Sequence, residues 1–232
     1  MIEEGQAPGA DSGDAEDSSE QQPDQKKGSF WKELPILLGV AILVAVVVRT
    51  FVIQTYYIPS GSMETTLDLD DRVLVNKLVY DFSEPERGEI IVFTAPESWR
   101  SDPDEDEFIK RVIATGGDHI VCCDDSGRIT VNGEPLDEDG YIYVNPLTGE
   151  QDVPSKDAFD VVVPEGRLWV MGDHRQASGD SRERYIRTGG DVEASTISVD
   201  AVIGKAFLLF WPFDHGNWFT IPETFEDVPD PS

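Results

Sequence analysis

One long apolar segment near the start of the chain constrains its fold more than any other feature. From Leu34 to Val48 every residue is apolar apart from one proline and one glycine, and after an interruption at Arg49 and Thr50 the apolar residues resume up to Ile53. A helix that crosses a hydrocarbon core of about 30 Å needs about 20 such residues, which this segment supplies. A buried core helix is the alternative, but the length and the flanks favour a transmembrane helix over residues 31–55.

The charges on either side of this segment predict its orientation. Lys26, Lys27 and Lys32 precede it, against Arg49 at its far end. Lys and Arg concentrate on the cytoplasmic side of membrane proteins. We therefore expect a single-pass protein of the cell (plasma) membrane with a cytoplasmic N-terminus. Residues 1–30 are acidic and poor in apolar side chains, a composition that predicts a disordered cytoplasmic tail.

The charge and the cysteine content exclude several classes of function. A formal net charge of -28 argues against nucleic acid as a partner, because phosphate contacts need Lys and Arg. Cys122 and Cys123 are adjacent, so they cannot form an ordinary disulfide framework. Three roles remain possible for these cysteines: small buried hydrophobic residues, a strained vicinal pair, or metal ligands. The chain has only three histidines, His119, His174 and His215, which argues against a His-rich metal site.

Beyond the apolar segment, short stretches rich in Val, Ile and aromatic residues alternate with turn signals. This texture predicts a mainly β domain over residues 56–232, with no long amphipathic helix. The Asn-Gly pair that begins at Asn132 predicts a hairpin. The predicted strands lie in the stretches "RVLVNKLVY", "EIIVFTA", "EFIKRVIAT", "HIVCC", "RITVNGEPL", "DVVVPEG", "RLWVMGD", "SVDAVIGKAFLLFW" and "WFTI".

Several serines could serve as a nucleophile, but residue type alone cannot rank them. A serine hydroxyl needs a neighbouring base before it attacks a carbonyl group. Each histidine directly follows an aspartate, but neighbours in a strand point to opposite faces, so these pairs carry little information. Surface or turn positions are the simpler reading of the three histidines. The candidate serines are Ser60, Ser62, Ser126, Ser178 and Ser181.

A lysine that is stripped of water is the other base available to a serine. Burial disfavours the ammonium form and lowers the pKa, and a neutral amine can accept the hydroxyl proton. Lys110 lies in an apolar strand, where alternation places it on one face with Phe108 and Val112. Such a lysine either extends its amine to solvent at a sheet edge or is buried, and the local pattern alone favours the first.

Four motifs that occur in order along the chain are recognisable together. They are "RTFVIQTYYIPSGSMETTL", "DRVLVNKLVYDFSEPERGEIIVF", "FIKRVIATGGD" and "MGDHRQASGDSR". With these motifs, nearly all of Arg49–Phe213 resembles the type I (leader) signal peptidases, membrane proteases that use a serine and a lysine. The resemblance implies a signal-peptidase-type, mainly β catalytic domain, tethered by one N-terminal transmembrane helix. It also implies a small variable β insertion at residues 122–165.

The resemblance implies a role for each polar residue of these motifs. Ser62 corresponds to the nucleophile, and Lys110 to the general base that later protonates the leaving amine. Ser60 corresponds to the hydroxyl that helps the Ser62 backbone N–H stabilise the oxyanion, and Ser178 to the serine that hydrogen-bonds and orients Lys110. A supporting salt-bridge cluster is implied at Asp180, Arg182 and Arg111. Shallow substrate pockets are implied at Ile58, Met63, Leu67, Phe108 and Ile109.

The implied function is removal of N-terminal signal peptides from exported preproteins. Cleavage is expected after small residues at the first and third positions before the scissile bond. The expected partners are these signal peptides and membrane lipid, with the secretion translocon as a further candidate and without nucleic acid. No cofactor and no metal are expected. The apolar stretch Phe207–Phe213 is either a surface that enters lipid or a core strand with some exposed aromatic residues.

The chain departs from the usual family pattern at several positions. Proline is usual where Thr65 stands, and asparagine is usual where His174 stands. Gln176 and Ala177 replace a more usual polar pair, and "ATGGD" stands in place of Gly-Leu-Pro-Gly-Asp. None of these changes removes a catalytic group, so they concern local turn geometry and rates.

Two alternative functions use the same residues. Self-cleaving repressor proteases look similar around a serine and a lysine, but they are soluble and intracellular, which the apolar segment argues against. A catalytically inactive, membrane-anchored binding module of the same fold is the other alternative. The presence of Ser60, Ser62, Lys110 and Ser178 together favours an active enzyme.

Overall fold

The computed structural model describes residues 30–231, so the predicted tail lies outside the described residues except for its last one. The chain divides into two units, residues 1–43 and residues 44–232. Helix α1 (Phe30–Val47) runs from the first unit into the start of the second. All the strands belong to the second unit.

Helix α1 differs from the predicted transmembrane helix at its C-terminal end. The α-helix ends at Val47, a π-helical turn covers Val48–Val52, and Ile53–Tyr57 form strand β1. The cause is tertiary, because every residue of β1 pairs with strand β2 (Arg72–Asn76), and the sheet therefore takes residues that the apolar pattern assigns to the helix. Among the helices in residues 30–231, none is long and apolar enough to cross a membrane.

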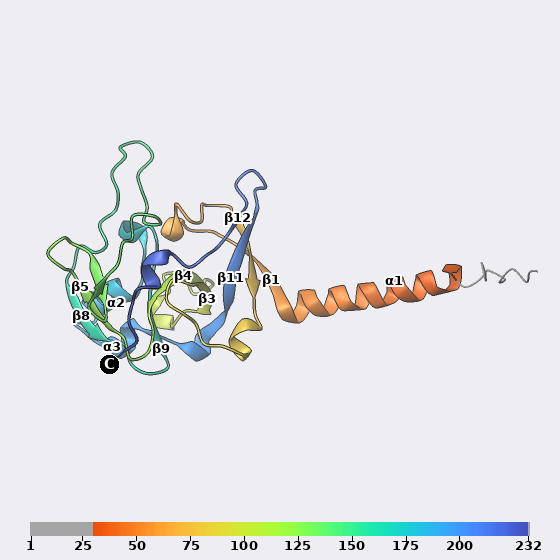
Figure 1. The fold of residues 1–232 in the computed structure, drawn as a ribbon, viewed down its shortest axis with the longest axis horizontal. Helices are drawn as coiled ribbons and strands as arrows, with labels where there is room; N and C mark the ends of the chain where they lie inside the picture. The colour runs from red at the N-terminus through yellow and green to blue at the C-terminus, as the bar shows by residue number, and fades with distance from the viewer. Residues whose placement is uncertain (1–29, 232) are drawn as a thin grey trace, which may run out of the picture. The chain divides into compact units, whose positions relative to one another are not determined.

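A curled antiparallel sheet of eight strands forms the body of the second unit (Figure 1). Its strands follow the order β1-β2-β11-β3-β4-β9-β10, with β12 paired to β11. The register of β11 shifts at irregularities along both neighbours, and such bulges bend and twist a sheet. The remaining bounds are β3 (Ile90–Thr94), β4 (Glu107–Ala114), β9 (Arg167–Met171), β10 (Ile197–Ser198), β11 (Val202–Trp211) and β12 (Asn217–Trp218).

A second antiparallel sheet of four strands, in the order β7-β6-β5-β8, comes from residues 119–162. This range covers most of the segment expected to be a variable insertion. The predicted hairpin is confirmed, because Asn132 and Gly133 have φ of 53° and 84° and connect β6 to β7. Cys122 and Cys123 are bonded to each other, so they form a vicinal pair. The bounds are β5 (His119–Cys122), β6 (Ile129–Val131), β7 (Glu134–Pro135) and β8 (Phe159–Val162).

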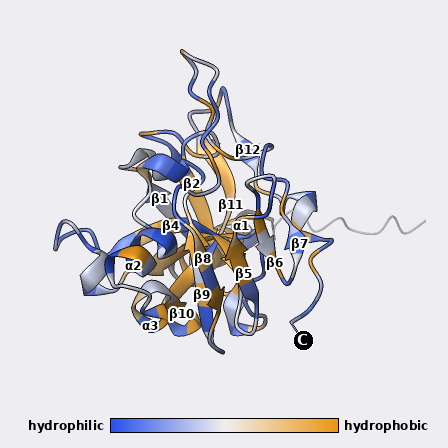
Figure 2. Cartoon of the chain, turned by 90° about the vertical axis from the view of Figure 1, so that its left-hand side faces the viewer, coloured by the Kyte–Doolittle hydropathy of each residue, from blue (hydrophilic) through white to orange (hydrophobic). Residues whose placement is uncertain are grey.

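The core consists of apolar side chains from the strands of both sheets, and Figure 2 shows the hydrophobic colour concentrated on these strands. Every stretch predicted as a strand from Arg72 to Trp211 contains one, because its Val, Ile and aromatic residues fill this core. The largest fully buried side chains include Trp99, Trp169 and Phe93. Burying one side chain of this kind contributes about 2–3 kcal/mol to stability.

Short helices and 3₁₀ turns connect the strands. Helix α2 (Ser181–Arg187) begins after Asp180, whose side chain accepts a hydrogen bond from the backbone N–H of Arg182. Helix α3 (Val192–Ser195) begins after Asp191 in the same manner. Aspartate is a favoured N-cap because its carboxylate accepts from free N–H groups of the first turn. The 3₁₀ turns are η2 (Gly61–Met63), η3 (Val79–Asp81), η4 (Glu97–Trp99), η5 (Arg175–Ala177), η6 (Val199–Ala201) and η7 (Glu223–Phe225).

Candidate active site

The side chains of Ser62 and Lys110 meet although they lie 48 positions apart in the chain. Ser62 is carried by turn η2, in the connection between β1 and β2, and Lys110 lies within β4. The Lys110 Nζ is 2.6 Å from the Ser62 Oγ and 3.0 Å from the carbonyl oxygen of Ile109. Both residues are buried, with exposed fractions of 4% for Lys110 and 7% for Ser62.

The position of Lys110 corrects the expectation that its amine extends to solvent. Strand β4 lies between β3 and β9 in the sheet, so Lys110 is not on an edge strand. Burial lowers the pKa of Lys110 to about 8, and the negative charges of Asp180 and Asp173 offset only part of this effect. A substantial fraction of Lys110 is therefore neutral near pH 8, and a neutral amine can accept a proton from the Ser62 hydroxyl.

The other two serines of the motifs occupy different positions around this pair. The Ser60 Oγ lies 3.4 Å from the Ser62 Oγ, on the wall of the cleft that contains both. The Ser178 hydroxyl is buried and makes no hydrogen bond to Lys110. It lies beside Asp180, whose pKa it helps to lower. The predicted hydrogen bond between Ser178 and Lys110 is absent, and the Lys110 amine bonds to the Ser62 hydroxyl and the Ile109 carbonyl oxygen.

Two separate ion pairs, rather than one cluster, support the loops of the site. Asp180 pairs with Arg182 at 2.7 Å, within the N-terminal turn of α2. Burial alone would raise the pKa of Asp180, but the Arg182 guanidinium holds it below its usual value. Arg111 does not join this pair, contrary to the prediction, because it donates to both carboxylate oxygens of Asp173 at 2.9 and 2.7 Å. The hydroxyl of Thr66 donates to the same carboxylate at 2.5 Å.

The Asp173 contacts were not predicted, although Asp173 belongs to one of the quoted motifs. Lys110 and Arg111 are neighbours in β4, so their side chains leave opposite faces of the sheet. Lys110 contacts Ser62, while Arg111 holds Thr66 through Asp173. The loop that follows the nucleophile candidate is thus attached to β4 on both faces.

A glycine allows the loop after β9 to approach the turn that carries Ser62. A Cβ atom on Gly172 would lie 2.3 Å from the Ser62 carbonyl oxygen and 2.4 Å from the Ser178 Oγ. Both distances are too short for any side chain. The backbone N–H of Gly172 donates to the Asp180 carboxylate at 3.1 Å, so the cap of α2 also fixes this close approach.

A cleft of about 370 Å³ opens at the Ser62–Lys110 pair. Phe108 and Ile109, two of the five predicted pocket residues, line this cleft. The other three, Ile58, Met63 and Leu67, are buried in the hydrophobic core and do not line it, because the turn after β1 packs them inward. The remaining lining residues are Pro59, Trp99, Ser101, Glu105, Glu107, Ala177, Gly179, Glu183, Arg184 and Arg187.

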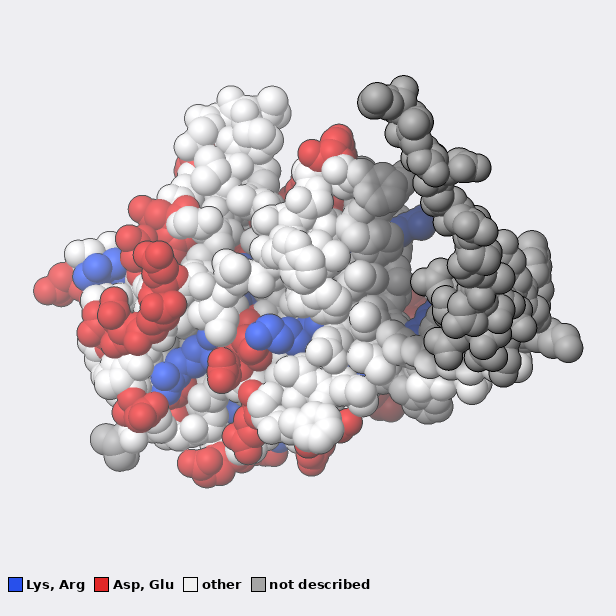
Figure 3. Space-filling model, turned by 45° about the vertical axis from the view of Figure 1, so that its right-hand side comes forward, with Lys and Arg blue, Asp and Glu red and all other residues white. Residues whose placement is uncertain are grey.

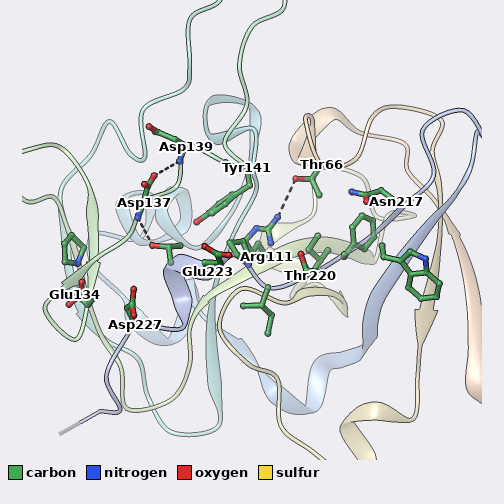
Figure 4. Close-up of a pocket in the computed structure, with 18 residues that line it drawn as sticks. Thr66, Arg111, Glu134, Asp137, Asp139, Tyr141, Asn217, Thr220, Glu223 and Asp227 are labelled. Carbon is green, nitrogen blue, oxygen red and sulfur yellow. Dashed lines mark hydrogen bonds between the residues drawn. The ribbon is translucent and has the colours of Figure 1, made fainter.

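A larger cavity, of about 770 Å³, is lined by Arg111 and lies on the opposite side of β4 from the Lys110 side chain. Figure 4 shows its acidic residues, among them Asp137, Asp139 and Glu223, around the open space. The lining contains no serine or lysine. The smaller cleft, in contrast, contains a serine with a buried amine at hydrogen-bond distance. We therefore take the smaller cleft as the candidate active site.

Acidic side chains dominate the charged surface, and Figure 3 shows them spread over one face of the molecule. The chain has 46 Asp and Glu residues against 18 Lys and Arg residues, so a polyanion would meet repulsion. Within residues 30–231, no group of three or more His, Cys, Asp and Glu side chains could hold a metal ion. The three histidines each contact a carboxylate: His119 contacts Asp160, His174 contacts Glu64, and His215 contacts Asp71.

The backbone at Thr65 explains why the usual proline is absent from the nucleophile motif. Thr65 has φ of 80°, a left-handed conformation that a β-branched residue adopts only with strain. Proline fixes φ near -65° and cannot adopt this conformation. Thr65→Gly should therefore increase the free energy of unfolding by about 1 kcal/mol. Thr65→Pro should decrease it by about 2 kcal/mol or more.

Thermal or urea unfolding of the full chain in detergent measures both changes at Thr65. Thr65→Ala is the matched control, because alanine is also strained at positive φ and should fall between the glycine and proline variants. A proline variant as stable as the parent would contradict the left-handed backbone at this position.

Comparison with known proteins gives consistent matches. Residues 31–211 match the family described as signal peptidase, peptidase S26. Signal peptidase I of Mycobacterium tuberculosis is 39% identical over 244 residues, which cover 89% of this chain and 81% of that protein. A probable signal peptidase I of Mycobacterium leprae is 38% identical over 231 residues, covering 81% of this chain and 78% of that protein. The crystal structure of a signal peptidase I from Enterococcus faecalis covers 53% of this chain and 97% of its own, with 26% identity and a TM-score of 0.39.

Proposed function

Since the chain belongs to the signal peptidase family, peptidase S26, and is a signal peptidase I hydrolase, we propose that Ser62 and Lys110 form its catalytic dyad. Family membership makes the protein a serine protease that removes signal peptides. The observation that carries the dyad is the 2.6 Å contact between the Lys110 Nζ and the Ser62 Oγ, with both side chains buried in the cleft.

The first half of the proposed reaction is acylation of Ser62. Neutral Lys110 accepts the Ser62 hydroxyl proton while the Oγ attacks the carbonyl carbon of the scissile peptide bond. The Ser62 backbone N–H and the Ser60 hydroxyl stabilise the oxyanion of the tetrahedral intermediate, where one such donor contributes about 3 kcal/mol. The Lys110 ammonium then gives its proton to the leaving amine, and the signal peptide remains as an ester on Ser62.

The second half is hydrolysis of this ester. Neutral Lys110 takes a proton from a water molecule, which attacks the ester carbonyl and releases the signal peptide with a carboxylate end. Ser62 recovers its proton from Lys110. In this account Ser178 takes no chemical step. Asp180, Arg182 and Gly172 hold the loop behind the dyad, through the hydrogen bonds described above.

The lining of the cleft supports a preference for small residues before the cleaved bond. Phe108 and Ile109 present apolar surface beside Lys110, and the cleft volume of about 370 Å³ is shared by several substrate residues. Bulky side chains at the first and third positions would compete for this limited space. We assign these positions to the Phe108–Ile109 wall, and we assign no contact with substrate to the buried residues of the core.

Exposed apolar surface supports attachment to a membrane, and the lysines that precede the apolar segment support a cytoplasmic N-terminus. Ile36 and Leu37 of α1 are 67% and 64% exposed, and such side chains are costly to leave in water. The aromatic residues Trp211, Phe213 and Trp218 are also exposed. Lipid contact would cover the apolar surface of each of these segments. The secretion translocon is a candidate source of the signal-peptide substrates.

The pH dependence of cleavage tests the proposed role of Lys110. Because its pKa is about 8 and only the neutral amine accepts a proton, kcat/KM should rise about tenfold per pH unit below pH 8 and level off above it. The measurement is cleavage of a preprotein in detergent across this range, with N-terminal sequencing of the product to establish the cleaved bond.

Circular dichroism at each pH controls for unfolding in this experiment. The expected cleavage site follows a signal peptide that has small residues at the first and third positions before the cleaved bond. A rate that stays flat or falls as the pH rises towards 8 would contradict Lys110 as the base. A product cut elsewhere would contradict the proposed specificity.

A further inference from the structure

His174 lies directly behind the turn that carries Ser62, a position that the sequence did not reveal. Its ring Nδ1 is 3.1 Å from the carbonyl oxygen of Gly61 and 2.8 Å from the Glu64 carboxylate. Both of these oxygens accept hydrogen bonds, so the ring nitrogen between them must carry a hydrogen and donate. The backbone N–H of His174 donates to the Ser62 carbonyl oxygen at 3.1 Å. His174 therefore holds the carbonyl groups on both sides of the Ser62 Cα.

The contact with Gly61 has a geometric consequence for Ser62. The Gly61 carbonyl and the Ser62 N–H belong to one planar peptide unit, in which C=O and N–H point in opposite directions. A donor that fixes the carbonyl oxygen on one side thus fixes the direction of the N–H on the other. This N–H is the backbone donor that the proposed mechanism uses for the oxyanion.

The His174 ring is itself held in place. It stacks on the ring of Tyr143 with centroids 3.8 Å apart and planes 20° from parallel. Its Nε2 lies 3.9 Å from the Asp152 carboxylate, and this carboxylate accepts a hydrogen bond from the backbone N–H of Gln176. The backbone N–H of Tyr143 donates to the carbonyl oxygen of Asp173. The insertion, through Tyr143 and Asp152, thereby supports the ring against the Ser62 turn.

We propose that His174 is a positioning residue for the oxyanion site, acting through the Gly61–Ser62 peptide unit. This inference rests on the proposed function, in which Ser62 is the nucleophile. A displaced donor weakens binding of the transition state more than binding of the substrate, so the effect falls on kcat rather than on KM. A displacement of about 1 Å in such a site can lower the rate about 100-fold.

The test compares variants at this position that keep or lose a side-chain donor. His174→Phe retains a planar ring for the Tyr143 stack but cannot donate, and we expect kcat to fall about 10- to 100-fold with KM unchanged. His174→Asn retains a donating amide, and we expect kcat within about threefold of the parent. His119→Phe is the matched control, since the His119 ring pairs with an exposed carboxylate, Asp160, outside the cleft, and its kcat should not change.

The outcomes separate this inference from the proposed function. A lower kcat in His174→Phe together with a near-parent kcat in His174→Asn supports the inference. If the phenylalanine variant does not fold, His174→Met takes its place as the variant without a donor. A parent-like kcat in the variant without a donor would overturn the positioning role of His174. So would an equally low kcat in His174→Asn, or a change in KM alone. Ser62→Ala is measured in the same assay: if it still cleaves the preprotein, the proposed function fails and the inference fails with it.

Discussion

Replacing Ser62 with alanine is expected to abolish cleavage of a preprotein, with kcat/KM reduced about 10⁵-fold or more. The Ser62 Oγ is the only hydroxyl that we assign to attack, and it lies 2.6 Å from the Lys110 Nζ in a buried pair. Alanine removes the nucleophile without adding volume, so the turn η2 and its hydrogen bonds should persist. The measurement is the initial rate of preprotein cleavage in detergent, with circular dichroism to establish that the variant is folded.

Alanine variants of two other serines serve as comparisons in this experiment. Ser60→Ala removes the proposed second oxyanion donor and should lower kcat about 100- to 1,000-fold, less than the loss of the nucleophile. Ser126→Ala changes an exposed turn residue outside the cleft and should leave the rate unchanged. Full activity in Ser62→Ala, or an equal loss in Ser126→Ala, would show that the serine assignment is wrong.

Replacing Lys110 with methionine is expected to produce a second inactive protein that is nevertheless more stable than the parent. Methionine fills a similar volume in β4 but cannot accept the Ser62 proton, so kcat/KM should fall about 10⁴-fold or more. The stability gain arises because burial makes the ammonium form of Lys110 unfavourable in the folded state. An inactive but destabilised variant would instead indicate that Lys110 serves mainly as a structural residue.

The sign and the pH range of this gain follow from the pKa of Lys110. Its folded-state value of about 8 lies below the ordinary value of 10.5, so folding releases protons between these two values. Below pH 8 the parent carries the full penalty of a buried ammonium, on the order of 3 kcal/mol. The penalty disappears as the pH rises towards 10.5, and the advantage of Lys110→Met over the parent should shrink with it.

Thermal unfolding of parent and variant at about pH 7 and about pH 10 measures this difference. Lys156→Met is the matched control, because Lys156 is exposed and its substitution should change neither the activity nor the pH dependence of stability. A stability difference for Lys110→Met that does not change with pH would contradict the low pKa of this lysine.

Much of the fold was predictable because strands in this chain carry a strong local signal. The Val- and Ile-rich stretches between Arg72 and Trp211 all contain strands, and the Asn132–Gly133 pair forms the expected hairpin turn. The end of helix α1 was not predictable. Residues 53–55 fall within the predicted helix, and the pairing of Ile53–Tyr57 with β2 makes them part of a strand.

The candidate site was predictable in its residues but not in its contacts. Alternation along β4 gives the face of Lys110, but it does not reveal that a loop from another part of the chain covers that face. For the same reason the partner of Arg111 could not be read from the sequence. The buried positions of Ile58, Met63 and Leu67 and the missing contact between Ser178 and Lys110 likewise depend on how distant loops pack.

The segment expected to be an insertion, residues 122–165, makes several contacts with the loop at the site. Glu138 forms a buried ion pair with Arg175, which follows His174 in the loop after β9. Arg175 also donates to the carbonyl oxygens of Gly172 and Pro154. Together with the stack of Tyr143 on His174, these contacts tie the insertion to the loop that supports the Ser62 turn.

Mapping of a covalent adduct tests directly whether Lys110 activates Ser62 as a nucleophile. The full-length protein is treated in detergent with an acylating penem, digested, and analysed by mass spectrometry. We expect one acyl group on Ser62 in the parent and none, over the same time, in Lys110→Met. An adduct on a different serine, or acylation of Ser62 at the parent rate without Lys110, would contradict this expectation.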